Sequence, residues 1–150
     1  MKYRYLAVAL LLSTIAALAL AQGYPIQITS VTTKDMTGVE RNTFSRGEIV
    51  VVETELTCPS AYYYYAPGGY SYLEIITMWY GNSMLNIVLT RDTIMAGETK
   101  IFGGGMFIRY SDPLGTYNIE VYVWNGFPSE MGAAWAPLAD IATTSITVTP

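Results

Sequence analysis

The segment from Asp112 to Trp124 constrains the fold more than any other part of the sequence. It begins with a turn signal, Pro113 and Gly115, and continues into an alternation of apolar and polar residues. One face of this alternation carries Tyr117, Ile119, Val121 and Val123, and the other carries Asn118, Glu120 and Tyr122. Because successive side chains of a strand point to opposite faces, the pattern predicts a half-buried antiparallel strand entered through a tight corner. Such a strand is typical of the penultimate strand of a β-sandwich.

Short segments with strand character recur along the rest of the chain. Strands are predicted at 26–32, 49–57, 73–80, 84–90, 99–102, 117–123 and 141–149. Turn signals separate them at intervals of about ten residues, and no segment has a sustained helical period. Three successive glycines, Gly103 to Gly105, predict a bulge or a sharp bend rather than a straight strand. The pattern favours an all-β fold, an antiparallel sandwich of about seven to nine strands.

The start of the chain has the three parts of a secretory signal peptide. Lys2 and Arg4 are basic, an uncharged apolar run extends over 6–20, and Ala19-Leu20-Ala21 is a small-x-small cleavage site. An apolar helix of this length spans only about 22 Å, less than the ~30 Å hydrocarbon core of a bilayer. Cleavage after Ala21 is therefore favoured over retention as a membrane anchor. We expect a signal peptide at 1–21 and one secreted domain at 22–150, with no membrane anchor after cleavage.

Cys58 is the only cysteine of the chain. An exported fold with one cysteine has no internal disulfide, and a domain of this length buries enough surface to fold without one. We expect Cys58 to be a small buried apolar side chain at a strand end, the alternative being an intermolecular disulfide.

Charge and residue types argue against several functional classes. Without Lys2 and Arg4, six basic residues (8 − 2) remain against 12 acidic ones, a net charge of −6. No basic run is present, so neither nucleic acid nor an anionic membrane is expected as a partner. Histidine is absent, which removes Ser-His-Asp and Cys-His catalysis and the common zinc sites. No phosphate-binding glycine motif occurs either, and we expect no cofactor.

Four carboxylates are the remaining candidates for chemistry. Glu53 and Glu55 are neighbours on one face of the predicted strand 49–57, about 6.6 Å apart along the backbone, within the separation that glycosidases use. They lie opposite an apolar face of Val50, Val52, Thr54 and Leu56, and we expect them to be solvated. Asp92 and Asp112 lie in predicted corners and are expected to cap turns rather than bind calcium. We therefore expect no enzyme, no catalytic residue and no metal site.

The tyrosine-rich loop at 61–72 exceeds what a connection between strands needs. Its tyrosines lie among glycine, serine and proline, a composition that resembles binding loops, because tyrosine offers a large rigid contact area and a hydroxyl. The alternative is that some of these rings cap the open end of the sandwich. The candidate binding residues are the loop tyrosines, Tyr62, Tyr63, Tyr64, Tyr65, Tyr70 and Tyr72, together with Trp135.

Three turn-and-strand motifs carry a family resemblance. They are Phe44-x-x-Gly47-Glu48-x-Val50-x-Val52, Ile94-x-x-Gly97-Glu98-Thr99 and Pro113-x-Gly115-x-Tyr117-x-Ile119-x-Val121. They are similar to those of secreted immunoglobulin-like or fibronectin-III-like domains of prokaryotic, archaeal-type surface proteins. The resemblance implies an immunoglobulin-like β-sandwich and says almost nothing of function. The unpaired Cys58 excludes the branch with a disulfide between the sheets, and Tyr117 resembles a tyrosine corner.

The sequence thus predicts an exported, non-catalytic immunoglobulin-like domain that acts by protein–protein contact at the cell surface. It would be a subunit or accessory of a filament or surface layer, with other surface proteins or further copies of itself as partners. In a sharper form, the segment 22–25 and the strand after it complete the sheet edge of a neighbour. The alternative is an extracellular ligand-binding module, with carbohydrate as the favoured ligand and the tyrosine-rich loop as its site.

Overall fold

The computed structural model describes residues 23–150, and the signal peptide predicted at 1–21 lies outside them. The described chain is an all-β sandwich of two sheets, as the sequence predicted. Its strands are β1 (Gln27–Lys34), β2 (Thr43–Ser45), β3 (Ile49–Thr57), β4 (Tyr70–Tyr80), β5 (Ser83–Ile94), β6 (Thr99–Phe107), β7 (Gly115–Trp124) and β8 (Ala142–Thr149). Short helical turns are η1 (Ser60–Tyr64), α2 (Pro128–Met131) and η2 (Gly132–Ala134).

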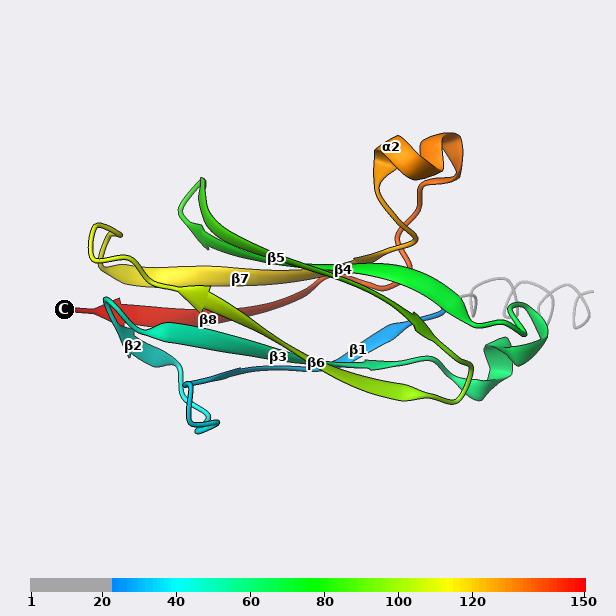
Figure 1. Cartoon of the computed structure of the whole chain (residues 1–150), viewed down its shortest axis with the longest axis horizontal. Coiled ribbons are helices and arrows are strands. Elements are labelled where there is room, and N and C mark those ends of the chain that lie inside the picture. The colour runs from blue at the N-terminus through cyan, green and yellow to red at the C-terminus, as the bar shows by residue number, and fades with distance from the viewer. Residues whose placement is uncertain (1–22) are drawn as a thin grey trace, which may run out of the picture.

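The two sheets pack face to face, with a small lobe on one of them (Figure 1). One sheet has the order β1-β3-β6 and the other has the order β2-β8-β7-β4-β5. Neighbouring strands are antiparallel, except that the short edge strand β2 runs parallel to β8. The lobe contains α2 and η2 and stands on the outer side of the five-stranded sheet, away from β3 (Figure 1). In the described residues, no helix is long and apolar enough to cross a membrane.

The core lies between the sheets, and β7 runs through its centre between β4 and β8. The inner side chains of β7 are fully buried, as the alternation predicted: Tyr117, Ile119, Val121 and Val123. The expected inner face of β3 is buried as well: Val50, Val52, Thr54 and Leu56. Alternating strands therefore build this core because each places every second side chain between the sheets.

The corner before β7 has the predicted tyrosine anchor. The hydroxyl of Tyr117 donates a hydrogen bond to the carbonyl oxygen of Pro113 at 2.5 Å, and its ring packs against Tyr80 with centroids 5.5 Å apart. Gly115, between them, has a φ of 128°, which favours glycine. The corner thus fixes where β7 enters the core.

Strand β4 is buried on both faces, from Tyr72 to Met78. Its inner side chains include Glu74, Ile76 and Met78, and its outer side chains include Leu73 and Ile75. Leu73 is flanked by Arg91 of β5 and Trp124 of β7. The outer face of the five-stranded sheet is therefore covered by side chains and is not simply solvated.

The bend predicted at Gly103 to Gly105 is wrong. These glycines lie within β6 and pair in unbroken register with β3. A Cβ on Gly104 would come within 2.8 Å of Cγ1 of Val88, which lies on β5 of the other sheet. The glycine permits close approach of the two sheets at this edge, which is the other established reason for glycine in a strand.

The segment around Ile26 belongs to the chain's own fold. Ile26 is buried, its N–H donates to the carbonyl oxygen of Leu138 at 2.9 Å, and β1 pairs antiparallel with β3. The strand after 22–25 thus completes an edge of its own sheet, so in this structure it does not extend toward a neighbour.

Candidate functional site

Three of the loop tyrosines pack against the end of the core. Tyr72 is buried, while Tyr62 and Tyr70 are half-buried and pack on a cluster that includes Cys58 and Ile94. The hydroxyl of Tyr62 donates to the carbonyl oxygen of Gly23 at 2.6 Å. Burial raises the pKa of Tyr72 to about 12. These rings close the end of the sandwich, which is the alternative that the sequence left open.

The other three loop tyrosines face solvent. Tyr63, Tyr64 and Tyr65 are 56, 89 and 76% exposed, and they lie in or directly after the short turn η1. The rings of Tyr63 and Tyr64 touch edge to face, with centroids 5.8 Å apart. The six tyrosines therefore do not share one surface. Trp135 packs elsewhere, on Trp124 of β7.

A second aromatic group lies on the outer face of the five-stranded sheet. It consists of Trp79, Tyr122, Trp124 and Trp135 and includes all three tryptophans of the chain; we call it the aromatic face. The ring centroids of Tyr122 and Trp124 are 5.6 Å apart, and those of Trp124 and Trp135 are 4.7 Å apart at 80°. Trp79 lies on β4 and donates its indole N–H to Oγ1 of Thr77 at 2.8 Å. Two neighbouring central strands and one loop thus present these rings on the same side.

Asn125 holds the loop that carries Trp135. Its side-chain amide donates to the carbonyl oxygen of Ala134 at 2.7 Å, and its side-chain oxygen accepts from the N–H of Ala136 at 3.0 Å. The N–H of Asn125 also donates to the carbonyl oxygen of Ala136 at 3.1 Å. The backbone on each side of Trp135 is therefore held in place, although the Trp135 side chain is 38% exposed.

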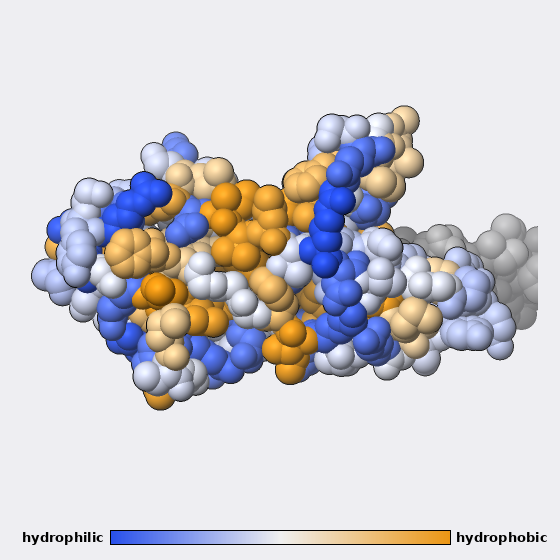
Figure 2. Space-filling model, viewed as in Figure 1, coloured by the Kyte–Doolittle hydropathy of each residue, from blue (hydrophilic) through white to orange (hydrophobic). Residues whose placement is uncertain are grey.

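The α2 lobe is tied to β5 on the same side of the sheet. Arg91 of β5 forms an ion pair with Glu130 of α2, and its guanidinium lies 4.7 Å from the ring centroid of Phe127. Figure 2 shows hydrophobic side chains gathered over the sheet in the notch beside this lobe. The exposed apolar residues of β5 include Ile87 and Leu89, both nearly half exposed. The lobe thus borders one end of an apolar outer surface.

A polar strip continues the aromatic face along β7 and β8. Two adjoining hollows share Asn118 and Glu120; one extends to Thr143 and Ser145, and the other to Trp79 and Asn82. The hydroxyl of Tyr122 donates to the carboxylate of Glu120, and this bond together with burial raises the pKa of Tyr122 to about 12. Polar groups of β7 and β8 therefore adjoin Tyr122 and Trp79 on one sheet face.

Sequence reasoning found only part of this face. It proposed Trp135 as a binding residue and placed Tyr122 on the outer side of its strand, but it did not single out Trp79 or Trp124. The usable signal was two large aromatic residues, Tyr122 and Trp124, at consecutive outward positions of one strand. Side chains at such positions point away from the core between the sheets.

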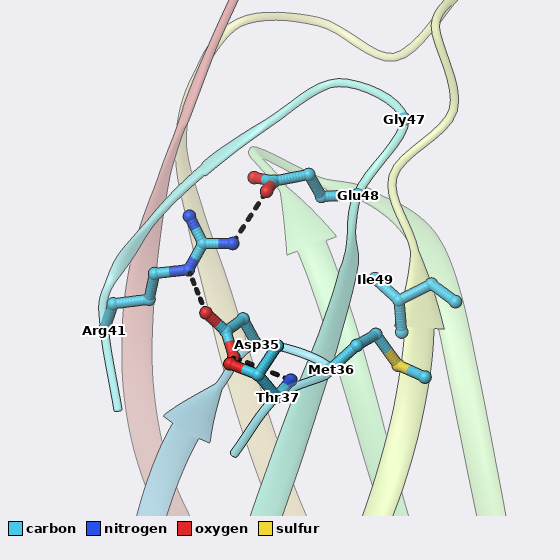
Figure 3. A pocket seen from close by; sticks show the side chains of 7 residues that line it. All are labelled: Asp35, Met36, Thr37, Arg41, Gly47, Glu48 and Ile49. Carbon is cyan, nitrogen blue, oxygen red and sulfur yellow. Dashed lines mark hydrogen bonds and ion pairs between the residues drawn. The ribbon is translucent and has the colours of Figure 1, made fainter. Parts of the chain in front are cut away.

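A separate hollow, between the segment after β1 and the start of β3, contains an ion cluster (Figure 3). Arg41 lies between Asp35 and Glu48, with N–O distances of 3.4 and 2.7 Å. Hydrogen bonds from Thr37 hold the pKa of Asp35 below its usual value, and the bond from Arg41 lowers that of Glu48. Since Arg41 pairs with both carboxylates, we interpret the cluster as a structural tie across the connection between β1 and β3.

The remaining candidate carboxylates have structural partners. Glu53 pairs with Lys34 at 2.6 Å, and Glu55 accepts a hydrogen bond from Thr29 at 2.6 Å, both on the outer face of the three-stranded sheet. Asp112 accepts from the N–H of Arg109 at 2.8 Å and caps its turn. Asp92 instead lies within β5 and pairs with Lys100. Within residues 23–150, no three carboxylate, histidine or cysteine side chains are grouped as a metal site requires.

Cys58 is buried directly after β3, as expected. Burial raises the pKa of its thiol, so the reactive thiolate is disfavoured. A buried, protonated thiol does not favour the intermolecular disulfide.

Comparison with known proteins supports the fold alone. No protein-family model and no curated protein matches the chain. Among solved structures, the C-terminal domain of wzt has a TM-score of 0.63 at 13% identity, over 86% of this chain and 75% of that one. The alkylpurine DNA glycosylase AlkC of Pseudomonas fluorescens, bound to DNA containing an abasic site analog, has a TM-score of 0.55 at 13% identity, over 85% of this chain but 31% of that one. At such identities the likeness shows a shared sandwich and no shared activity.

Proposed function

We propose that this chain is an exported, non-catalytic, immunoglobulin-like domain that binds its partner at the cell surface through the aromatic face. One observation carries the proposal: Tyr122, Trp124 and Trp135 pack together on the outer side of the sheet, outside the core between the sheets, and Trp79 lies on the same side farther along β4. Large, rigid aromatic rings on a surface are typical of binding sites. Export is supported by the signal-peptide pattern of 1–21.

The non-catalytic part of the proposal is supported by residue types and by the partners of the carboxylates. The sequence has no histidine, and Glu53 and Glu55 are engaged by Lys34 and Thr29 on an open sheet face. A pair of catalytic carboxylates would instead face each other across a cleft, in surroundings that separate their pKa values.

Binding to cell envelopes tests this proposal whatever the chemistry of the partner. Labelled protein is added to washed envelopes of the organism that makes it, and bound protein is measured against concentration. We expect saturable binding that Trp124→Ala and Trp135→Ala weaken at least tenfold. Tyr64→Ala, which removes an equally aromatic but separate exposed ring, is the matched control and should bind normally. Binding that depends on Tyr64 and not on the tryptophans would assign the site to the tyrosine-rich loop instead.

Protein–protein assembly into a filament or surface layer is the second candidate. It is favoured by the outer face of the three-stranded sheet, where Ile101 and Phe107 are 65 and 46% exposed. Gly103 and Gly105 lie between them on the same face and present bare backbone. Light scattering and electron microscopy of concentrated protein test it, with Ile101→Ser as the variant. We expect the parent chain to form polymers and the Ile101→Ser variant to remain dispersed. A parent chain that stays monomeric at all concentrations would exclude the assembly.

A further inference from the structure

We infer that the aromatic face binds a neutral carbohydrate chain, and that it does so without cleaving it. This inference rests on the proposed function, because it names the ligand class of the same face. The argument combines the geometry of the rings, the chemistry of the polar strip and the rigidity of the support.

The rings supply the apolar half of a sugar site. Trp124 and Trp135 meet at 80° with centroids 4.7 Å apart, so the two indoles form a corner with aromatic walls in two directions. A sugar ring has faces of C–H groups, which make favourable contacts with aromatic rings. Trp135 is 38% exposed, so ring surface is open to such a ligand.

The polar strip supplies the hydrogen bonds. Sugar hydroxyls both donate and accept, and they match an amide, a carboxylate and hydroxyl groups. These groups are Asn118, Glu120, Thr143 and Ser145, and they line two adjoining hollows, one of which also includes Trp79. The nearby cation Arg91 is already paired with Glu130 and lies over Phe127. Because the strip offers one carboxylate and no unpaired cation among its lining residues, it suits neutral sugars better than acidic ones.

The dimensions favour a chain over a single sugar. Alternate residues of a strand are spaced by about 6.7 Å, so the side chains from Asn118 to Trp124 extend over about 20 Å. They form an open strip along β7, which a monosaccharide would occupy only in part. Several successive sugar units are needed to contact both the rings and the polar groups.

The face is also held in shape before any ligand binds. Asn125 fixes both sides of Trp135, Thr77 fixes the indole of Trp79, and Glu120 accepts from Tyr122. A site whose side chains are already ordered loses less conformational entropy on binding. Hydrolysis would require a second carboxylate opposite Glu120, and the residues that line the strip include only this one.

Affinity electrophoresis with soluble neutral polysaccharides, a glucan, a mannan and a xylan in separate gels, tests the ligand class. We expect at least one to retard the protein, with the dissociation constant raised at least tenfold in Trp124→Ala and Asn118→Ala. Tyr64→Ala should migrate like the parent chain, and circular dichroism checks that each variant is folded. Retardation that is equal in the parent and in Trp124→Ala would overturn the assignment to this face.

The envelope assay separates failure of this inference from failure of the proposed function. Periodate cleaves sugar diols, and proteinase K removes proteins. Tryptophan-dependent binding that periodate abolishes supports a carbohydrate ligand. Tryptophan-dependent binding that proteinase K abolishes and periodate spares, with no retardation by any polysaccharide, overturns the inference and leaves the proposed function standing. Envelope binding that is unchanged in both Trp124→Ala and Trp135→Ala refutes the inference and the proposed function together.

Discussion

The buried carboxyl group of Glu74 gives the sharpest prediction about stability. Glu74 lies on the inner face of β4 and is fully buried between the sheets. The hydroxyl of Thr54 donates a hydrogen bond to its Oε1, while Oε2 is buried and has no hydrogen-bond partner among the described residues. Burial, partly offset by the bond from Thr54, raises the pKa of this group above its ordinary value of 4.5.

The sign of the pH dependence follows from that shift. Between pH 4.5 and the raised pKa of the folded state, the native protein binds more protons at Glu74 than the unfolded chain does. The free energy of unfolding must therefore fall as the pH rises through this window, by at most about 1.4 kcal/mol per pH unit for one proton. Below pH 4.5 both states are protonated and the contribution of Glu74 is complete.

The substitution Glu74→Gln replaces the titrating carboxyl group by an amide that does not titrate. At pH 4 we expect the variant to be less stable than the parent by about 1–3 kcal/mol, because its amide buries two unpartnered N–H donors where the neutral acid buries one O–H. The difference should shrink or reverse as the pH rises, since only the parent must bury a charge or retain a proton. Urea unfolding followed by tryptophan fluorescence between pH 4 and 8 measures both curves. Parallel curves for the parent and Glu74→Gln over that range would refute the reasoning.

Three further predictions concern packing and the aromatic face. Tyr117→Phe removes the bond to the Pro113 carbonyl and should cost about 1 kcal/mol in urea unfolding, with the fold retained. Gly104→Val should cost about 1–3 kcal/mol or more, because its Cβ meets Val88 at 2.8 Å; Gly103→Ala, with 3.6 Å to its nearest neighbour, is the control and should change stability little. Asn125→Ala should lower envelope binding at least threefold at nearly unchanged core stability, and equal binding would contradict the role of a fixed Trp135.

Alternation along single strands predicted the core well. The inner faces of β3 and β7 follow directly from period-two patterns, and the bounds of β3 match the predicted 49–57. The double burial of β4 was not predictable in this way, because its outer cover includes Trp124, which is far away in the sequence. The prediction of a bend at Gly103 to Gly105 failed for a related reason. A glycine signals either a bend or a close approach, and only Val88 from the other sheet decides between them.

The sequence predicted which side chains of the candidate site face outward, but not which of them come together in space. The sequence indicated that Tyr122 faces outward, and the loop tyrosines were visible as a composition. It left open whether some of those tyrosines cap the sandwich, because the choice depends on where Ile94 and Cys58 meet them. It also did not indicate that Trp124 of β7 and Trp135 of the loop after α2 would meet, or that Trp79 of β4 would lie on the same sheet face, since these follow from the tertiary fold and from the pairing of β4 with β7.

Strand β7 serves both the fold and the proposed binding face. One of its sides packs in the core, and the other carries most of the binding residues. The inner residues of β7 lie fully in the core, and the outer residues from Asn118 to Trp124 form the strip and the rings. Because both edges of β7 are hydrogen-bonded to β4 and β8, its outer side chains gain a rigid base that the exposed turn η1 does not offer. Substitutions on the outer face should therefore change binding while the inner face continues to stabilise the domain. If Trp124→Ala unfolded the protein as severely as a core substitution in β7, this separation of binding from folding would be wrong.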